Sequence, residues 1–151
     1  MSRRPSHGHQ RVLARLMIKV GAAAVARGAD AAQEPGIVWE EDGEDNVSPD
    51  FTITFGPMPL PGEKLRRCPD LIVEVLSAGE ENRRRDVDAK RGLYWRRGAK
   101  EYWIVDPNRR EITRLVRGAS AWGEQLLGES DRVTTPLLAG WEGIEVRELF
   151  D

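Results

Sequence analysis

The segment Pro69–Ser77, with the sequence PDLIVEVLS, constrains the fold of this chain more than any other part of it. Side chains alternate along a strand, so Leu71 to Val75 would point in turn to the two faces, with Ile72 and Glu74 on the same one. A strand that is apolar on both faces is typical of a sheet that is covered on both sides. Glu74 would then be a carboxylate inside the protein, where it needs a positively charged partner.

The stretch Arg83–Arg97, which we expect to be a helix, offers that partner. At about 100° per residue, Val87, Lys90 and Tyr94 fall on one stripe of the helix, and this stripe should face the sheet. Lys90 would therefore point inward, toward Glu74. Two alternatives stay open: Lys90 extends along the apolar surface to water, or it forms a purely structural ion pair with Glu74, Asp50 or Asp86.

A second acid, Asp50, is expected beside Glu74. The apolar stretch Asp50–Phe55 follows a proline, which suits the start of a strand because it cannot donate to the ladder. If the two strands pair, Asp50, Glu74 and Lys90 meet. The two carboxylates would be hard oxygen ligands for Mg²⁺ or Mn²⁺, and Mg²⁺ usually takes one or two protein carboxylates together with substrate phosphate oxygens. The carbonyl of Val75 is a candidate third ligand.

Three longer strings of the sequence resemble the Uma-two family of restriction-endonuclease-like proteins, in the PD-(D/E)XK nuclease superfamily: PDLIVEVLS, RRRDVDAKRGLYWRRGAKEYWIVDP and TTPLLAGWEGIEVRELF. The resemblance runs from about His9 to the last residues. It implies a Mg²⁺-dependent phosphodiesterase whose two acids fall on Asp50 and Glu74 and whose lysine falls on Lys90. In the strict superfamily motif the lysine stands two residues after the acid, where this chain has Leu76, so the helix would supply it.

The resemblance also implies one restriction endonuclease-like domain over residues 1–151, of the α/β (α+β) class. The expected order is helix, strand, strand, strand, helix, strand, with a C-terminal β extension, and without the hairpin that precedes the first helix in most relatives. The residues themselves favour helices near 9–27 and 83–97, and strands near 36–40, 50–55, 101–106 and 111–116 beside the Glu74 strand. The proline-rich loop 56–69 is expected close to the site.

Three further residues are candidates for supporting roles at the site. His9 could assist because histidine titrates near neutrality, or it could be a surface group at the start of a helix. Asp70 lies on the Glu74 face and could be a second-metal ligand, although a turn at the strand entrance explains it equally well. Tyr94 could hold the lysine or touch phosphate, or it could be a core aromatic residue.

The net charge of −2 excludes a strongly basic protein that attracts nucleic acid over its whole surface. Any such affinity must be local, and Arg83, Arg84 and Arg85 are favoured because they lie at the start of a helix, where anions bind. A solvated helix face is the alternative. The single cysteine, Cys68, is expected to be a structural thiol. The tryptophans are expected to be packing or interface residues.

We therefore expect a Mg²⁺-dependent endonuclease that hydrolyses nucleic-acid phosphodiester bonds, with DNA as its first candidate substrate. The alternative is a catalytically inactive nuclease-fold protein that acts in binding or assembly. Nothing in the sequence resembles a signal peptide or a membrane span, so a cytoplasmic protein without a membrane partner is expected. A homodimer is an open alternative to a monomer.

Overall fold

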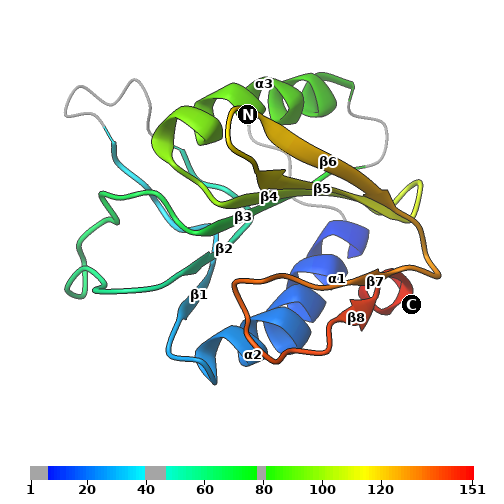
Figure 1. Ribbon diagram of the computed structural model, residues 1–151, viewed down its shortest axis with the longest axis horizontal. Helices are drawn as coiled ribbons and strands as arrows, with labels where there is room; N and C mark the ends of the chain where they lie inside the picture. The colour runs from blue at the N-terminus through cyan, green and yellow to red at the C-terminus, as the bar shows by residue number, and fades with distance from the viewer. Residues whose placement is uncertain (1–6, 40–46, 78–80) are drawn as a thin grey trace.

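The computed structural model describes residues 7–39, 47–77 and 81–151, with only the backbone described for 81–83 (Figure 1). In chain order the elements are α1 (His7–Arg15), the π-helix η1 (Leu16–Gly21), α2 (Ala22–Val25), β1 (Asp30–Gln33), β2 (Phe51–Thr54), β3 (Leu71–Val75), α3 (Glu81–Arg97), β4 (Glu101–Asp106), β5 (Glu111–Arg117), β6 (Trp122–Leu127), β7 (Arg132–Val133), β8 (Ile144–Glu145) and the 3-10 helix η2 (Val146–Leu149).

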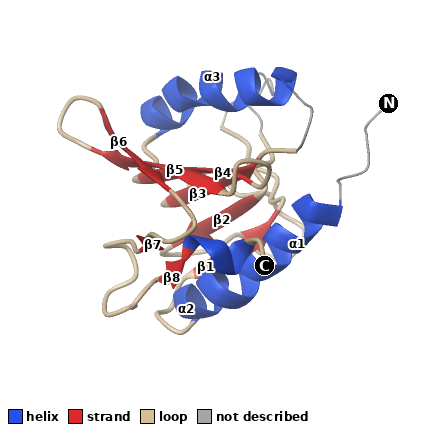
Figure 2. Cartoon of the chain, turned by 90° about the vertical axis from the view of Figure 1, so that its right-hand side faces the viewer, coloured by secondary structure: helices blue, strands red, loops and turns tan. Residues whose placement is uncertain are grey.

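A six-stranded sheet in the order β1-β2-β3-β4-β5-β6 forms the centre of the molecule. The strands β3 and β4 are parallel and are joined by α3, whereas the other neighbouring pairs are antiparallel. Helix α3 covers one face of the sheet, and the N-terminal helices lie on the opposite face together with the C-terminal segment (Figure 2). This arrangement confirms the predicted fold class and the predicted order of helices and strands.

The central strand β3 separates two hydrophobic cores, as its alternating pattern predicts. Leu71, Val73 and Val75 belong to the core beneath the N-terminal helices. Ile72 packs on the other face, in the core that includes Tyr94 of α3. Every residue of β3 is buried, so Glu74, which shares a face with Ile72, is enclosed between the sheet and α3.

The strand predicted over 36–40 is wrong for the described residues 36–39, residue 40 lying outside the described part of the chain, and the first strand lies earlier, at β1. The backbone of Glu34 has a φ of +48°, and Pro35 follows it, so the extended chain is interrupted after β1. Beyond the interruption, the buried Ile37 forms only isolated bridges, with Val47 and Leu65. The strand β1 pairs instead with β2, and this pairing holds β2 on its outer side.

The loop between β2 and β3, predicted to lie close to the site, is attached to the sheet away from Asp50 and Glu74. Because the two strands are antiparallel, with Phe51 opposite Val73, the loop connects the ends of the strands that are remote from these two acids. Its residue Leu65 packs against the segment that follows β1, where the Val38 amide donates to the Leu65 carbonyl at 2.9 Å.

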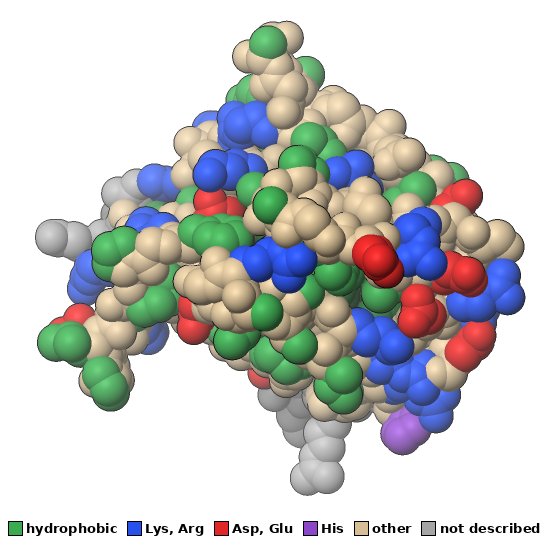
Figure 3. All heavy atoms as spheres, turned by 60° about the horizontal axis from the view of Figure 1, so that its bottom comes forward, with side chains coloured by type: hydrophobic (Ala, Val, Ile, Leu, Met, Phe, Trp, Pro, Cys, Tyr) green, Lys and Arg blue, Asp and Glu red, His purple; other side chains and the backbone are tan. Residues whose placement is uncertain are grey.

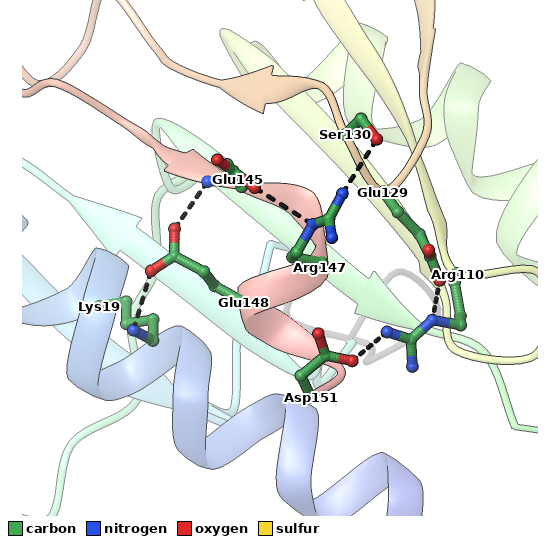
Figure 4. Close-up of polar contacts among 8 residues, drawn as sticks. All are labelled: Lys19, Arg110, Glu129, Ser130, Glu145, Arg147, Glu148 and Asp151. Carbon is green, nitrogen blue, oxygen red and sulfur yellow. Dashed lines mark hydrogen bonds and ion pairs between the residues drawn. The ribbon is translucent and has the colours of Figure 1, made fainter.

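A set of polar contacts, here called the C-terminal clasp, ties the end of the chain to the rest of the molecule (Figure 4). Lys19 of η1 donates to the Glu148 carboxylate at 3.1 Å. Arg110, beside β5, forms ion pairs with Glu129 and with the last residue, Asp151. The clasp therefore holds η2 between the N-terminal helices and the sheet.

Candidate active site

The main chain of Asp50, just before β2, contacts the neighbouring segments on both sides. Its amide donates to Glu74 Oε1 at 3.1 Å, and its carbonyl accepts from the amide of Glu34 at 3.0 Å. Its side chain bridges to the next strand, because Oδ2 accepts from the amide of Val75 at 2.7 Å. Asp50 and Glu74 thus lie next to each other at the same level of neighbouring strands.

Glu74 is fully buried and receives donors from α3. Its Oε2 accepts from the Lys90 ammonium at 3.1 Å and from the Tyr94 hydroxyl at 3.4 Å. Lys90 and Tyr94 are one helical turn apart, so both reach the same carboxylate. Lys90 lies where the helical periodicity places it, on the stripe that faces the sheet, with 19% of its side chain exposed.

Asp86 is a further acid at this place, and the sequence suggests it only as one of several ion-pair partners for Lys90. Its carboxylate lies 3.1 Å from the Lys90 ammonium, at the (i, i+4) spacing that allows such pairs on a helix, and about half of its side chain is exposed. Lys90 therefore bridges a buried carboxylate, Glu74, and a solvent-facing one.

His9 joins the cluster from α1, on the other side of the sheet. The ring is buried, and Nε2 lies 3.5 Å from Asp50 Oδ2. Asp70 does not join it: this residue precedes β3, four positions before Glu74, where it accepts from the amide of Phe55 and pairs with Lys100. Of the six side chains that the sequence suggests for this site or its support, the structure leaves out only Asp70. The five that it brings together are Asp50, Glu74, Lys90, His9 and Tyr94.

The arginines at the start of α3 differ in their surroundings. Arg84 forms an ion pair with Asp106 at 2.5 Å, and Asp106 also accepts from two amides of the following turn. Arg85 is exposed, and Arg83 falls outside the described side chains. Of the two described arginines, Arg85 is the better candidate for phosphate.

The comparisons with known proteins agree with this architecture. The sequence matches a family described as "Uma2: Putative restriction endonuclease" over residues 1–147. The chain belongs to the Uma2 family. A solved structure from Anabaena variabilis, titled a putative nuclease belonging to DUF820, is similar with a TM-score of 0.80 and 17% identity, over 99% of this chain and 84% of that one. At this identity the likeness shows the fold. No curated protein matches the sequence significantly.

The donor chemistry of the Uma2 site fits a hard divalent cation. Across the described residues, no group of three or more His, Cys, Asp or Glu side chains is arranged to hold a metal ion. Mg²⁺ needs fewer protein ligands, since it keeps several waters and usually takes one or two carboxylates. Among the described side chains, the carboxylates of Glu74 and Asp86 contact the Lys90 ammonium, and Asp50 lies against Glu74. A cation would offset this concentration of carboxylates in a place with little access to water.

The face of the Uma2 protein opposite α3 carries basic, acidic and apolar side chains intermixed, without a broad area of one sign (Figure 3). This mixture is consistent with the small net charge of the chain. Among the described residues, no helix has both the length and the apolar character needed to cross a membrane.

Proposed function

We propose that this protein is a Mg²⁺- or Mn²⁺-dependent nuclease that hydrolyses phosphodiester bonds, with DNA as the first candidate substrate. One observation carries the proposal. Asp50 and Glu74, from neighbouring strands, lie in contact with each other, and the Lys90 ammonium lies against the second of them. Two acids and one lysine around a single point are the minimal set for metal-assisted cleavage of a phosphodiester.

Each residue of the cluster has a role that follows from its contacts. Asp50 and Glu74, with the Val75 carbonyl, would hold the cation, which when bound polarises the phosphate and lowers the pKa of a water molecule. Lys90 would orient that water or stabilise the charge that develops on the phosphate. Tyr94 fixes the Glu74 carboxylate by its hydroxyl, and His9 fixes the Asp50 carboxylate.

The substrate would approach across the start of α3. Arg85, exposed on the first turns of this helix, would contact a phosphate, and the helix N-terminus would add to the attraction. Because this contact is electrostatic, it should weaken as the salt concentration rises. A homodimer would bring two such sites to a duplex, one for each strand.

Hydrolysis by designed variants tests the proposal. Purified protein is incubated with single-stranded DNA, duplex DNA and RNA in Mg²⁺, Mn²⁺ or EDTA. Asp50→Asn, Glu74→Gln and Lys90→Met should each reduce the cleavage rate by about a hundredfold or more, because each removes a group that acts on the metal or the transition state. Asp70→Asn is the matched control: it neutralises an acid beside the same strand, outside the cluster.

The alternative function is that of a catalytically inactive nuclease-fold protein, and the buried contact between Lys90 and Glu74 is the observation that favours it. In that case the cluster is a structural ion pair. Absence of metal-dependent cleavage of all three polymers would contradict the nuclease proposal. So would cleavage that survives all three substitutions, because it would come from a contaminant.

A further inference from the structure

A second candidate site lies away from the acidic cluster, between α3 and the turn that joins β5 to β6. It is an open pocket of about 360 Å³, and its lining includes Trp95, Trp122, Gly92, Arg91 and Arg96. None of these residues contributes to the contacts of Asp50, Glu74 and Lys90 described above. The pocket therefore needs an explanation of its own.

The walls of the pocket are two indole rings that are held in place. Trp95 and Trp122 meet edge to face, with ring centroids 5.3 Å apart. The Trp122 ring nitrogen donates to the carbonyl of Arg91 at 3.0 Å, so its polar edge is already satisfied. The guanidinium of Arg117 stacks on Trp95, 4.0 Å from the ring centroid, and donates to carbonyls at the end of α3. The rings thus form a preformed apolar surface.

Arginines border this apolar surface. Arg96 is exposed, and Arg91 is half-buried. Arg91 contacts Asp88 at 3.2 Å and Glu124 at 3.3 Å, so its charge is partly balanced. The ring surface and the arginine beside it together suit a ligand that is flat, aromatic and negatively charged.

Gly92 keeps the pocket open. It lies in the middle of α3, where glycine costs about 1 kcal/mol of helix stability relative to alanine. A Cβ atom at this position would meet only Arg96 Nη1, at 3.4 Å, which is ordinary contact with the end of a flexible side chain. The backbone would therefore accept a side chain at residue 92, and the main effect of adding one would be to fill the pocket.

We propose that this pocket binds a nucleobase of single-stranded nucleic acid, stacked on the face of one of the two indole rings, with the adjoining phosphate on Arg96. Stacking on aromatic side chains beside a positive charge is how proteins hold unpaired strands without reading their sequence. Bases inside a duplex are already stacked on one another and cannot enter. The inference rests on the proposed nuclease function and deepens it, because it assigns an unpaired strand or a frayed end as part of the substrate.

Fluorescence anisotropy in EDTA tests the pocket without cleavage. The probes are a labelled thymidine oligonucleotide of about twelve nucleotides, within the range of single-strand site sizes, and a duplex of equal length. Gly92→Leu, Arg96→Gln and Trp122→Leu should each weaken single-strand binding about tenfold, with little effect on the duplex. Gly92→Leu should also melt no lower than the wild type, so loss of binding cannot be attributed to unfolding.

Two control variants carry the same changes outside the pocket. Ala89→Leu adds the same side chain on an exposed position of the same helix, and Arg132→Gln removes an exposed arginine on β7. Both should bind the single strand as the wild type does. Wild-type protein that does not bind it, Gly92→Leu protein that binds it normally, or an equal loss of duplex binding would each overturn the proposal.

Failure of the pocket proposal can be distinguished from failure of the nuclease proposal. Asp50→Asn, which should not cleave, should still bind the oligonucleotide normally, because Asp50 is not part of the pocket. A protein that never cleaves can therefore still show the pocket, and a protein without the pocket can still show metal-dependent cleavage.

Discussion

At the scale of single residues, burial determines what the polar groups of this protein can do. Glu74 is completely enclosed, and its carboxylate is stabilised by the Asp50 amide, the Lys90 ammonium and the Tyr94 hydroxyl. A carboxylate in such a place is costly unless donors surround it. The contacts that arrange the candidate site are thus also the contacts that make Glu74 tolerable in the folded protein.

Replacement of Lys90 measures this dependence. Lys90→Met should lower the free energy of unfolding by about 3 kcal/mol, because it leaves the buried Glu74 carboxylate without its ammonium. The double variant Lys90→Met/Glu74→Gln should recover much of the loss. Urea unfolding of the wild type, both single variants and the double variant gives the interaction free energy between Lys90 and Glu74. A Lys90→Met protein as stable as the wild type would contradict the buried pair.

Cys68 provides a second test at this scale. Burial raises the pKa of its thiol to about 12, from an ordinary value of 9.0; nearby Asp70 adds to the rise, and Arg117 and Arg97 oppose it. Alkylation of the folded protein by iodoacetamide at pH 8 should therefore be much slower than that of the urea-unfolded chain.

The same shift in the pKa of Cys68 predicts a loss of stability in alkali. Between pH 9 and pH 12 the thiol ionises in the unfolded chain but stays protonated in the folded one, so the free energy of unfolding should fall as pH rises. Cys68→Ala removes this component, and the difference between the two proteins isolates it. Alkylation of the folded protein at the rate of the unfolded chain would contradict the burial of the thiol.

At the scale of elements, the sequence pattern predicts those parts whose own residues carry the signal. The strand β3 is predicted correctly because it is a short, nearly continuous apolar run, and the helix α3 because Val87, Lys90 and Tyr94 fall on one stripe. The strand β1, with the sequence DAAQ, has no such signal and forms because β2 offers a partner. Most of β6 is exposed, so its residues show no alternation of apolar and polar side chains that burial would impose.

Some features of the candidate site can be predicted from the sequence, and others depend on the tertiary structure. The inward direction of Lys90 follows from helical periodicity alone. The contact between Asp50 and Glu74 depends on the register of β2 against β3, which places Phe51 opposite Val73, and no local pattern specifies that register. Asp70 shares a face with Glu74 but lies four positions along the strand, and only the structure separates it from the site.

Substitution of Gly143 tests how closely β7 packs against the segment before β8. The φ of this glycine is +80°, and a Cβ atom would clash with the carbonyl oxygen of Val133, so Gly143→Ala should lower the free energy of unfolding by about 3 kcal/mol or more. Gly62→Ala is the matched control: its φ is +87°, with nothing within 4 Å, so only backbone strain of about 1 kcal/mol should appear. Equal losses in denaturant unfolding would show that the close approach of β7 to Gly143 does not exist.

At the scale of the whole molecule, the C-terminal clasp makes stability depend on pH. The pKa of Glu148 is lowered, chiefly by the hydrogen bond from the Glu145 amide and then by Lys19. Its carboxylate is ionised in the folded state over a wider pH range than in the unfolded chain. Its contribution is therefore fully present above the ordinary pKa of 4.5 and is lost as pH falls through the lowered value.

Glu148→Gln should accordingly be less stable than the wild type at pH 7, and this difference should shrink below pH 4. Because both side chains of the Lys19–Glu148 pair are more than one-third exposed, the difference should not exceed about 1 kcal/mol. Thermal unfolding at a series of pH values measures it. A difference that persists unchanged at pH 3 would mean that the carboxylate charge does not contribute.

The molecule as a whole places two features on the α3 side of one sheet. The acidic cluster lies where β2, β3 and α3 meet, and the aromatic pocket lies between α3 and the β5–β6 hairpin. A strand of nucleic acid that follows α3 could contact both. Under the proposed function, these two features would be the local contacts by which a protein with little net charge holds a nucleic acid.

The proposed chemistry depends on Asp50 and Glu74 together holding one divalent cation. Calorimetric titration of the purified protein with Mn²⁺ tests whether they do. We expect one Mn²⁺ per chain, a melting temperature that rises with Mn²⁺ concentration, and loss of both effects in Asp50→Asn but not in Asp70→Asn. Wild-type protein that takes up no Mn²⁺, or Asp50→Asn protein that takes it up as the wild type does, would contradict the proposed binding.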